Sequence, residues 1–346
     1  MAFKPQCLAS GIGSFPHKKP EAACDVIMKT IPEIPVWPQL PNTSFREQME
    51  IQYSEGLPCV AFDEEKQRMY FDTSGDPTSE LEKFYENYMA ENLDYFKISP
   101  EFSRGVYEME KRLRQKDLTS LKYFKSQVTG PVTTGLGRVD ENKRSIYYNE
   151  VFRDIIVKGM EMKARWLLNK FKFIGCDQIC FVDEPILSGF GSSTYVSVHR
   201  SDVVKYINDV VEAVHKEGAL AGTHCCGNTE WPILVDAGVD VISFDAYEYG
   251  DTVGYYPQQI RSFLDRGGVL AWGIVPTSDK VNQENPESLL KKLEEGVKNL
   301  ADKGINKDLL WERCLLTPSC GTGSLSVELS EKIFEQLYEV GRLLRD

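Results

Sequence analysis

The sequence lacks the features that mark a secreted, membrane-bound or nucleic-acid-binding protein. Its first residues, MAFKPQCLASGIGSFPH, contain no apolar stretch typical of a signal peptide. No uninterrupted apolar run approaches the roughly 20 residues that a membrane-spanning helix needs. Basic clusters are also missing, and the net charge of −12 disfavours nucleic acids and anionic membranes as partners. We therefore expect a cytoplasmic protein with neither kind of partner.

Histidine is scarce, with four residues in a chain of 346, and the nine cysteines follow no regular spacing. An odd number of irregularly spaced cysteines argues against a disulfide framework. In a reducing compartment such cysteines are free thiols, metal ligands or catalytic groups. The sequence also has no Gly-x-Gly-x-x-Gly motif after a strand, which disfavours a dinucleotide-binding doubly wound sheet.

What the sequence does contain is an alternation of short apolar segments and long amphipathic ones, typical of β/α units around a parallel sheet. Eight segments are predicted as strands: 7–14, 35–40, 125–130, 178–184, 220–226, 240–246, 269–275 and 314–320. The clearest helices are predicted over 145–171, 201–218, 285–304 and 326–344. The count predicts a single (β/α)₈ TIM barrel over residues 1–346. An open doubly wound sheet is the alternative.

An insertion is expected between the second and third strands, over about residues 59–116. It contains a predicted hairpin at 59–72 and two charged helices from about 79 to 116. No linker-like stretch divides the chain into two domains.

Polar residues gather where the predicted strands end, which is where (β/α)₈ barrels carry their active sites. The residues concerned are Gly13, Ser14 and His17 after the first strand, Asp183 and Glu184 after the fourth, His224 and Cys226 after the fifth, Asp245 after the sixth, and Cys320 after the eighth.

The spacing of His224 and Cys226 favours a metal site. Residues two apart on a strand face the same side, so these two side chains can converge while Cys225 faces away. Cys320 is expected to approach from a different strand, and an imidazole with two thiolates suits zinc. Asp245 is the nearest carboxylate for a fourth ligand, although a strand-end aspartate can instead cap the next helix; Glu248 is its competitor.

The remaining strand-end residues favour substrate binding. Asp183 and Glu184 are candidates for an acid–base pair or for anchors of a substrate amine, with salt bridging between loops as the structural alternative. Gly13 and Ser14 can offer backbone N–H groups and a hydroxyl to a carboxylate. His17 lies at the same rim, and we treat it with Asp183 as a candidate catalytic residue.

The motifs GIGSFPH, VTGPVT, VDEP, HCC, DVISFD and PSCG occur in this order, and the sequence thereby resembles the catalytic barrel of cobalamin-independent methionine synthases. The segment HCCGNTEWPILVDAGVDVISFD is also similar to the zinc segment of corrinoid methyltransferases related to uroporphyrinogen decarboxylase. The resemblance spans the first to the eighth predicted strand.

The resemblance implies zinc bound by His224, Cys226 and Cys320, with Asp245 at the position where the family has a glutamate ligand. It also implies contacts from Ile12, Gly13 and Ser14 to the carboxylate of an amino-acid substrate. Asp183 would contact the substrate's amino group, and Glu47 is a candidate for a second amine contact.

Two departures from the family concern the methyl donor. The sequence has no match for the additional N-terminal domain that helps to hold folate in full-length members. It also reads LAWGIVPTS after the seventh strand, where those members have a histidine-bearing segment used for proton transfer. Both departures favour methylcobalamin or a methylcorrinoid protein over methyltetrahydrofolate.

The implied function is therefore a zinc-dependent methyltransferase of methionine biosynthesis that transfers a methyl group to the thiol of homocysteine. A corrinoid protein is the partner that this function implies. The alternatives are a corrinoid-dependent methyltransferase that uses coenzyme M or tetrahydrofolate as acceptor, a porphyrinogen decarboxylase, and a non-catalytic protein with structural zinc.

Overall fold

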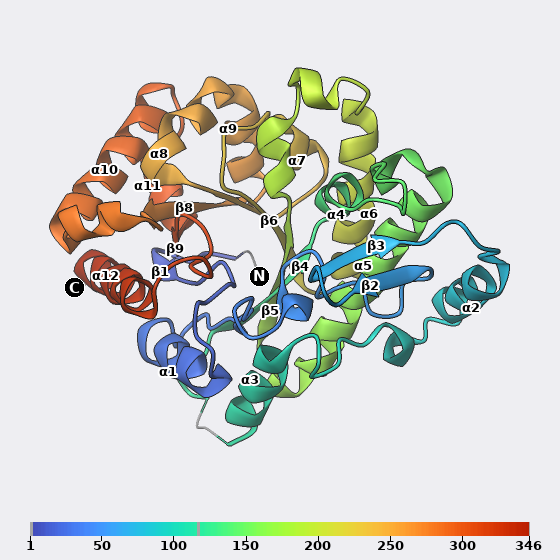
Figure 1. Ribbon diagram of the computed structural model, residues 1–346. Helices are drawn as coiled ribbons and strands as arrows, with labels where there is room; N and C mark the ends of the chain where they lie inside the picture. The colour runs from blue at the N-terminus through green and yellow to red at the C-terminus, as the bar shows by residue number, and fades with distance from the viewer. Residues whose placement is uncertain (1–2, 116–117, 346) are drawn as a thin grey trace.

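A curved parallel β-sheet surrounded by helices dominates the computed structural model, which describes residues 3–115 and 118–345 (Figure 1). Seven strands pair in the order β1-β9-β8-β7-β6-β5-β4, every neighbouring pair parallel. Their bounds are Leu8–Ala9 (β1), Tyr123–Thr129 (β4), Asp177–Asp183 (β5), Leu220–Cys225 (β6), Val241–Phe244 (β7), Val269–Val275 (β8) and Cys314–Pro318 (β9).

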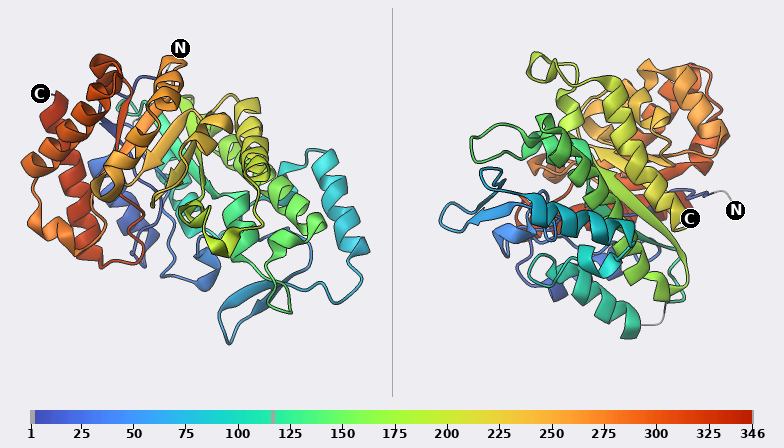
Figure 2. Two further views of the ribbon diagram at one scale, coloured as in Figure 1. Left: turned by 90° about the horizontal axis from the view of Figure 1, so that it is seen from above. Right: turned by 90° about the vertical axis from the view of Figure 1, so that its right-hand side faces the viewer.

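The helices lie along the outside of this sheet, and a helix precedes each strand from β4 to β9 (Figures 1 and 2). Their bounds are Pro20–Thr30 (α1), Thr78–Met89 (α2), Arg104–Gln115 (α3), Pro131–Gly137 (α4), Glu150–Lys170 (α5), Arg200–Lys216 (α6), Pro232–Asp236 (α7), Ala246–Tyr249 (α8), Pro257–Asp265 (α9), Pro286–Asp302 (α10), Lys307–Glu312 (α11) and Val327–Arg345 (α12). Within the described ranges, no helix combines the length and the apolarity needed to cross a bilayer. The four long helices predicted from periodicity are confirmed as α5, α6, α10 and α12.

The strand predicted over residues 35–40 is the main correction to the predicted fold. This segment joins its neighbours only through two isolated parallel bridges, one between Val36 and Lys125 on β4 and one between Gln39 and Ser14. Its sequence, PVWPQL followed by Pro41, places a proline at every third position, and proline has no N–H to donate to a ladder. The sheet therefore has seven regular strands, and residues 35–40 lie between β1 and β4 without forming an eighth.

Alternation along the strands determines which side chains share one face of the sheet. A cluster of buried residues, separate from the core packed against the helices, defines what we call the inner face: Phe3, Leu8, Ile34, Ile179, Phe181, Val241, Val269, Ala271 and Leu315. Leu220 of β6 packs against this cluster. Because alternate residues share a side, Asp183 follows Phe181 onto the inner face, and His224 follows Leu220.

The predicted hairpin is present as β2 (Val60–Asp63) and β3 (Arg68–Phe71), which pair antiparallel with Val60 opposite Phe71. Two helices, α2 and α3, follow it as expected, and residue 116, the predicted end of the insertion, lies outside the described residues. The hairpin and α2 project to one side of the sheet (Figure 2).

An ion pair between α6 and the start of β7 makes the stability of the fold depend on pH. His215 Nε2 lies 2.7 Å from Asp240 Oδ2, and this hydrogen bond raises the pKa of His215 above its usual value of 6.5. The protonated ring therefore stabilises the fold fully below about pH 6.5, and this contribution is lost as the pH rises through the higher folded-state value. We expect the free energy of unfolding, measured by urea denaturation at pH 6, 7 and 8, to fall less steeply in His215→Gln than in the wild type.

The control for this prediction is His199→Gln, which removes an exposed imidazole at the start of α6. This variant should keep the wild-type pH dependence. A His215→Gln protein whose stability follows the wild-type pH profile would contradict the role given to the pair.

Candidate metal centre

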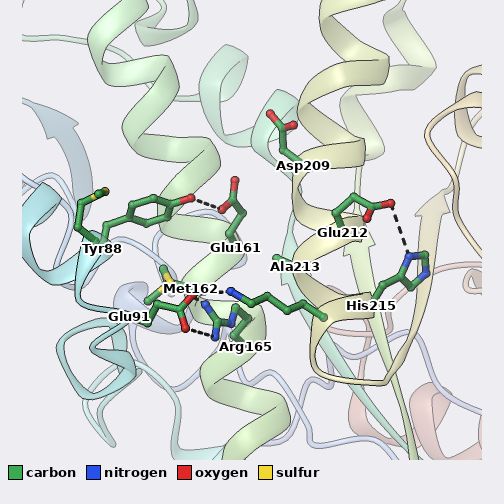
Figure 3. A pocket seen from close by; sticks show the side chains of 11 residues that line it. Tyr88, Glu91, Glu161, Met162, Arg165, Asp209, Glu212, Ala213 and His215 are labelled. Atoms are coloured by element: carbon green, nitrogen blue, oxygen red, sulfur yellow. Dashed lines mark hydrogen bonds and ion pairs between the residues drawn. The ribbon is translucent and has the colours of Figure 1, made fainter.

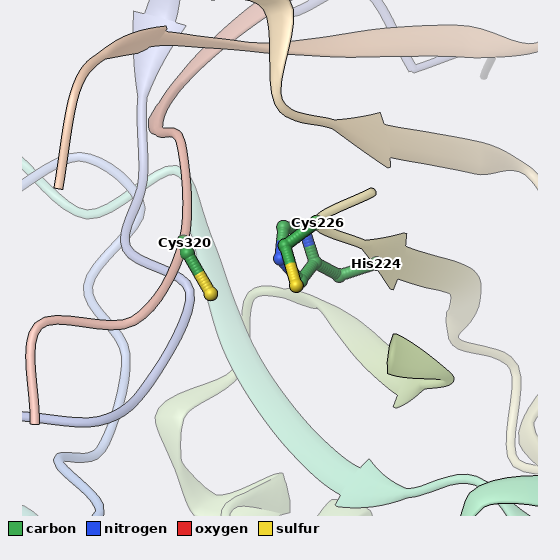
Figure 4. A group of neighbouring side chains, drawn as sticks. All are labelled: His224, Cys226 and Cys320. Atoms are coloured by element: carbon green, nitrogen blue, oxygen red, sulfur yellow. The ribbon is translucent and has the colours of Figure 1, made fainter. Parts of the chain in front are cut away.

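Three metal-binding side chains meet at the carboxyl end of the sheet. Ligand atoms of His224, Cys226 and Cys320 all lie within 4.8 Å of one another, and the three side chains turn toward a common point (Figure 4). His224 lies on β6, Cys226 directly follows it, and Cys320 lies two residues after β9. Because β7 and β8 separate β6 from β9 in the sheet, the group spans the concave side of the curve. The convergence predicted from the sequence is confirmed.

Strand alternation explains why only one of two adjacent cysteines joins this group. Cys225 is fully buried in the core between sheet and helices, and its thiol donates to the backbone oxygen of Gly227. Cys226 and His224 occupy the other side. None of the nine cysteines, all of which lie in the described part of the chain, forms a disulfide.

The imidazole of His224 is oriented as a metal ligand would be. Its Nδ1 lies 3.0 Å from the hydroxyl of Ser243, the residue opposite it on β7. Its Nε2 is sealed from solvent and has no hydrogen-bond partner among the described residues. When Nδ1 donates to Ser243, Nε2 carries a lone pair, and that lone pair faces the two sulfurs. A buried nitrogen without a partner beside two thiols fits a zinc ion.

The two thiols influence each other's ionisation. The S–H of Cys320 stabilises the thiolate of Cys226 and lowers the pKa of Cys226. The same thiolate, together with burial, raises the pKa of Cys320 well above its usual value. Metal ligation requires thiolates, so the lowered pKa of Cys226 favours its ligating form.

Two glycines let the loop after β9 bring Cys320 to this position. A Cβ at Gly321 would lie 2.0 Å from the Ser14 Oγ atom, and one at Gly323 would lie 3.0 Å from the Ser14 Cβ atom. The loop is bonded to the same serine, since Gly323 N donates to Ser14 Oγ and Thr322 N donates to Ser14 O. The first strand end thus positions a metal-binding residue from the last.

A pocket of about 270 Å³ opens onto the three side chains. Besides them it is lined by Ile12, Ser14, Gln39, Pro41, Glu47, Met49, Asp183, Pro185, Gly321, Gly323 and Ser324. Four of the residues expected to bind substrate, Ile12, Ser14, Glu47 and Asp183, therefore line one cavity with the metal-binding group. No lysine or arginine is among the described residues that line it.

Burial and the nearby ammonium of Lys125 have opposite effects on the ionisation of Asp183. Its side chain is buried, and its Oδ1 is sealed from solvent with no hydrogen-bond partner among the described residues. Burial raises the pKa of Asp183 to about 6, and the ammonium of Lys125 acts in the opposite direction. Lys125 is itself fully enclosed and donates from Nζ to Ile12 O at 2.9 Å. Asp183 thus places a buried carboxyl group in the wall of the pocket, and its Oδ1 lacks a partner to offset the cost of burial.

Glu47 reaches the pocket from the 3-10 helix Phe45–Glu47 and is fully buried. Its Oε1 accepts from Thr43 Oγ1 at 2.6 Å, and its Oε2 accepts from Arg104 N at 3.2 Å. Burial raises the pKa of Glu47, while these two hydrogen bonds and the Arg104 side chain favour the ionised form. A second carboxyl group therefore lines the same cavity as Asp183.

Other predicted site residues have partners elsewhere. Glu184 accepts hydrogen bonds at the start of α4, from Val132 N at 2.9 Å and from Thr133 N at 2.7 Å, and burial raises its pKa to about 7. Asp245 Oδ1 accepts from Glu248 N at 2.9 Å and caps α8, and Asp245 is not part of the three-residue group.

The remaining predictions are placed as follows. The side chain of Glu248 pairs with Lys280 at 2.6 Å. His17 is buried with its Nε2 3.4 Å from Glu331, and it does not line the pocket. Gly13 does not line it either; it has a φ of 148° and lies against the side chains of Gln39 and Gln127. Sequence reasoning missed Gln39, which lines the pocket from a segment that does not form a regular strand.

A larger cavity of about 690 Å³ lies on the outer face between α2, α5 and α6 (Figure 3). Its charged side chains are bonded to one another. Glu91 pairs with Arg165 at 3.2 Å and with Lys216, and Tyr88 donates to Glu161 at 2.7 Å. The clustered metal ligands belong to the smaller pocket, so we assign the candidate site there.

The contact between Ser243 and His224 can be tested by its effect on metal affinity. Removing the partner of a ligating imidazole typically weakens metal binding by about 10- to 100-fold. We expect Ser243→Ala to lose zinc affinity by this amount, measured by competition with a chromophoric chelator. Thr223→Val is the matched control, because Thr223 adjoins His224 on the opposite side of β6 and its hydroxyl has no partner among the described residues. Equal affinities for both variants would contradict the proposed orientation of His224.

Comparison with known proteins identifies a similar fold but no matching family. No family model matches the chain, and no curated protein matches it. A Listeria monocytogenes protein assigned as a vitamin-B12 independent methionine synthase matches over 94% of this chain and 85% of its own, with a TM-score of 0.54 and 13% identity. A β-mannanase from Alicyclobacillus acidocaldarius matches with a TM-score of 0.37 and 11% identity, over 69% of this chain and 78% of its own. The chain therefore has a methionine-synthase-like fold, with a His-Cys-Cys group that could hold zinc.

Proposed function

We propose that the protein is a zinc-dependent methyltransferase that transfers a methyl group to the thiol of homocysteine and so forms methionine. The donor in this proposal is methylcobalamin or a methylcorrinoid protein. The observation that carries the proposal is the meeting of His224, Cys226 and Cys320 in a pocket that the carboxyl-bearing residues Asp183 and Glu47 also line.

The residues supply two kinds of recognition at the two ends of one small molecule. A zinc ion bound by the three ligands would keep a substrate thiol deprotonated near neutral pH. Asp183 and Glu47 hold the ammonium of the amino acid, while Ile12 and Ser14 face its carboxylate. Held at both ends, the substrate sulfur is aligned with the methyl donor, and alignment of this kind can lower a barrier by several kcal/mol.

In the transfer step, the sulfur forms a bond to the methyl carbon, and the electron pair of the breaking bond stays with the leaving group. The thiol proton has already been lost to solvent. A cobalt leaving group keeps the pair without protonation, whereas a folate nitrogen needs a proton. His224 is the only histidine among the described residues that line the pocket, and β8 carries none. This supports a corrinoid donor over methyltetrahydrofolate.

The charges of the pocket favour an amino-acid acceptor over the alternatives. A sulfonate such as that of coenzyme M, or the propionates of a porphyrinogen, would need cationic side chains. The described lining contains two carboxyl groups and no lysine or arginine. Like charges without counterions repel, so Asp183 and Glu47 disfavour both anionic substrates. A purely structural zinc would not need an adjoining pocket with two carboxyl groups.

The test is methionine formation by the zinc-loaded protein. Homocysteine is offered with methylcobalamin in one reaction and with methyltetrahydrofolate in another, and methionine is detected by mass spectrometry. We expect methionine from methylcobalamin, loss of the activity after treatment with a chelator, and recovery when zinc is restored. Methionine from neither donor, or unchanged activity without metal, would overturn the proposal.

A further inference from the structure

Three buried polar side chains, Gln39, Gln52 and Tyr53, form a hydrogen-bonded network on one wall of the pocket. The network begins at two backbone carbonyl groups. Gln52 Nε2 donates to Phe102 O at 2.8 Å, and Tyr53 OH donates to Gln127 O at 2.8 Å. Because a carbonyl oxygen can only accept, the directions of both hydrogen bonds are fixed.

These two hydrogen bonds determine the orientation of the Gln39 amide. With their donors directed to carbonyl groups, Gln52 presents Oε1 and Tyr53 presents an oxygen lone pair. Gln39 Nε2 donates to both, at 3.0 Å and 3.1 Å. Both amide hydrogens of Gln39 are thereby used, and a flipped amide would place its oxygen against two acceptors. The Oε1 atom of Gln39 must therefore point away from the network.

The Oε1 atom of Gln39 is an acceptor that remains available in the pocket. It has no hydrogen-bond partner in residues 3–115 and 118–345, and it is not among the side-chain atoms sealed from solvent. Gln39 is only 4% exposed and lines the pocket. A Cβ at Gly13 would lie 2.8 Å from this oxygen, so glycine at position 13 leaves it uncovered.

We propose that Gln39 determines specificity for an amino-acid acceptor by accepting an N–H from the substrate's ammonium, an inference that rests on the proposed function. An ammonium has three N–H donors, and three acceptors from different side chains line this pocket: Asp183, Glu47 and Gln39. The neutral amide of Gln39 completes the set of three acceptors without adding a third negative charge to the two carboxylates. The network fixes the amide in its accepting orientation before any ligand binds, which reduces the cost of ordering it.

The test compares two thiols that differ only in the ammonium. Homocysteine and 4-mercaptobutyrate share the same chain, thiol and carboxylate, and their dissociation constants for the zinc-loaded protein are measured by calorimetry. Gln39→Met keeps the length of the side chain and removes the acceptor. We expect it to weaken homocysteine binding about tenfold, as for the loss of a hydrogen bond to a charged group, and to leave 4-mercaptobutyrate binding unchanged.

Two further variants separate recognition from structure. Gln336→Met removes the same group from a buried position on α12 that does not line the pocket, and both thiols should bind it as they bind the wild type. Gln39→Asn keeps the amide on a side chain that is one methylene shorter, and it replaces Gln39→Met in the test if that variant unfolds. It should also weaken the binding of homocysteine and leave the binding of 4-mercaptobutyrate unchanged.

The outcomes distinguish this inference from the proposed function. Equal weakening of both thiols in the Gln39 variants, or unchanged homocysteine binding, would overturn the role of Gln39 and leave the proposed function intact. A wild-type protein that binds homocysteine no better than 4-mercaptobutyrate would also overturn it. If the wild type binds neither thiol, the proposed function fails and this inference fails with it.

Discussion

Cys226→Ser is expected to weaken zinc binding by more than a hundredfold and to reduce methionine formation to background. Loss of an outer partner of a ligand already costs about 10- to 100-fold in metal affinity, and Cys226 would be a direct ligand. Its thiolate is also the one that the thiol of Cys320 stabilises. Zinc content after dialysis, together with chelator competition, measures the first effect, and the methionine assay measures the second.

The chain supplies a matched control one residue away. Cys225→Ser makes the same chemical change in a thiol that is fully buried on the opposite side of β6. It should lower the free energy of unfolding by about 1–3 kcal/mol, because a hydroxyl is buried in an apolar setting, while zinc content stays the same. A Cys226→Ser protein that keeps full zinc and full turnover would remove the metal centre from the mechanism.

Asp183→Asn is expected to lower kcat/KM for homocysteine about a hundredfold. Removing one partner of a buried, hydrogen-bonded charge pair costs about 2–5 kcal/mol, and Asp183 is a buried carboxyl group that lines the pocket. Because the ammonium lies away from the reacting sulfur, the change should appear mainly as a higher KM with a smaller effect on kcat. Zinc content should remain at the wild-type level, which separates this variant from Cys226→Ser.

The control for Asp183 lies at the other end of the same strand. Asp177→Asn alters an exposed aspartate at the start of β5, and its kcat/KM should equal that of the wild type. A loss in Asp183→Asn that 4-mercaptobutyrate suffers to the same degree would contradict the assignment of Asp183 to the ammonium.

The part of the site that the sequence predicted follows from two short-range rules. Alternation along a strand places His224 and Cys226 on one side and Cys225 on the other. The parallel arrangement brings the carboxyl ends of separate strands to one edge, which joins Asp183 and Cys320 to them. Both rules act on residues inside strands or within two residues of a strand end, and β5, β6 and β9 pair regularly with their neighbours.

The predictions that did not converge on the pocket concern groups with a competing local partner. Glu184 accepts from the first backbone N–H groups of α4, where a carboxylate satisfies unpaired donors and the helix dipole. Asp245 caps α8 in the same manner, as the helix-cap alternative anticipated. Gln39 was missed for the opposite reason: its significance depends on a network that joins residues 52, 53, 102 and 127, and no local pattern reports such contacts.

The prolines at positions 35, 38 and 41 also affect how Gln39 is held in the wall of the pocket. A regular strand is held by successive backbone hydrogen bonds to its neighbour. Residues 35–40 instead join their neighbours at two isolated bridges. The position of Gln39 in this stretch therefore depends on its side-chain hydrogen bonds to Gln52 and Tyr53. The sulfur ligands instead follow β6 and β9, which pair regularly with their neighbours, so strand pairing positions the metal ligands whereas side-chain hydrogen bonds position Gln39.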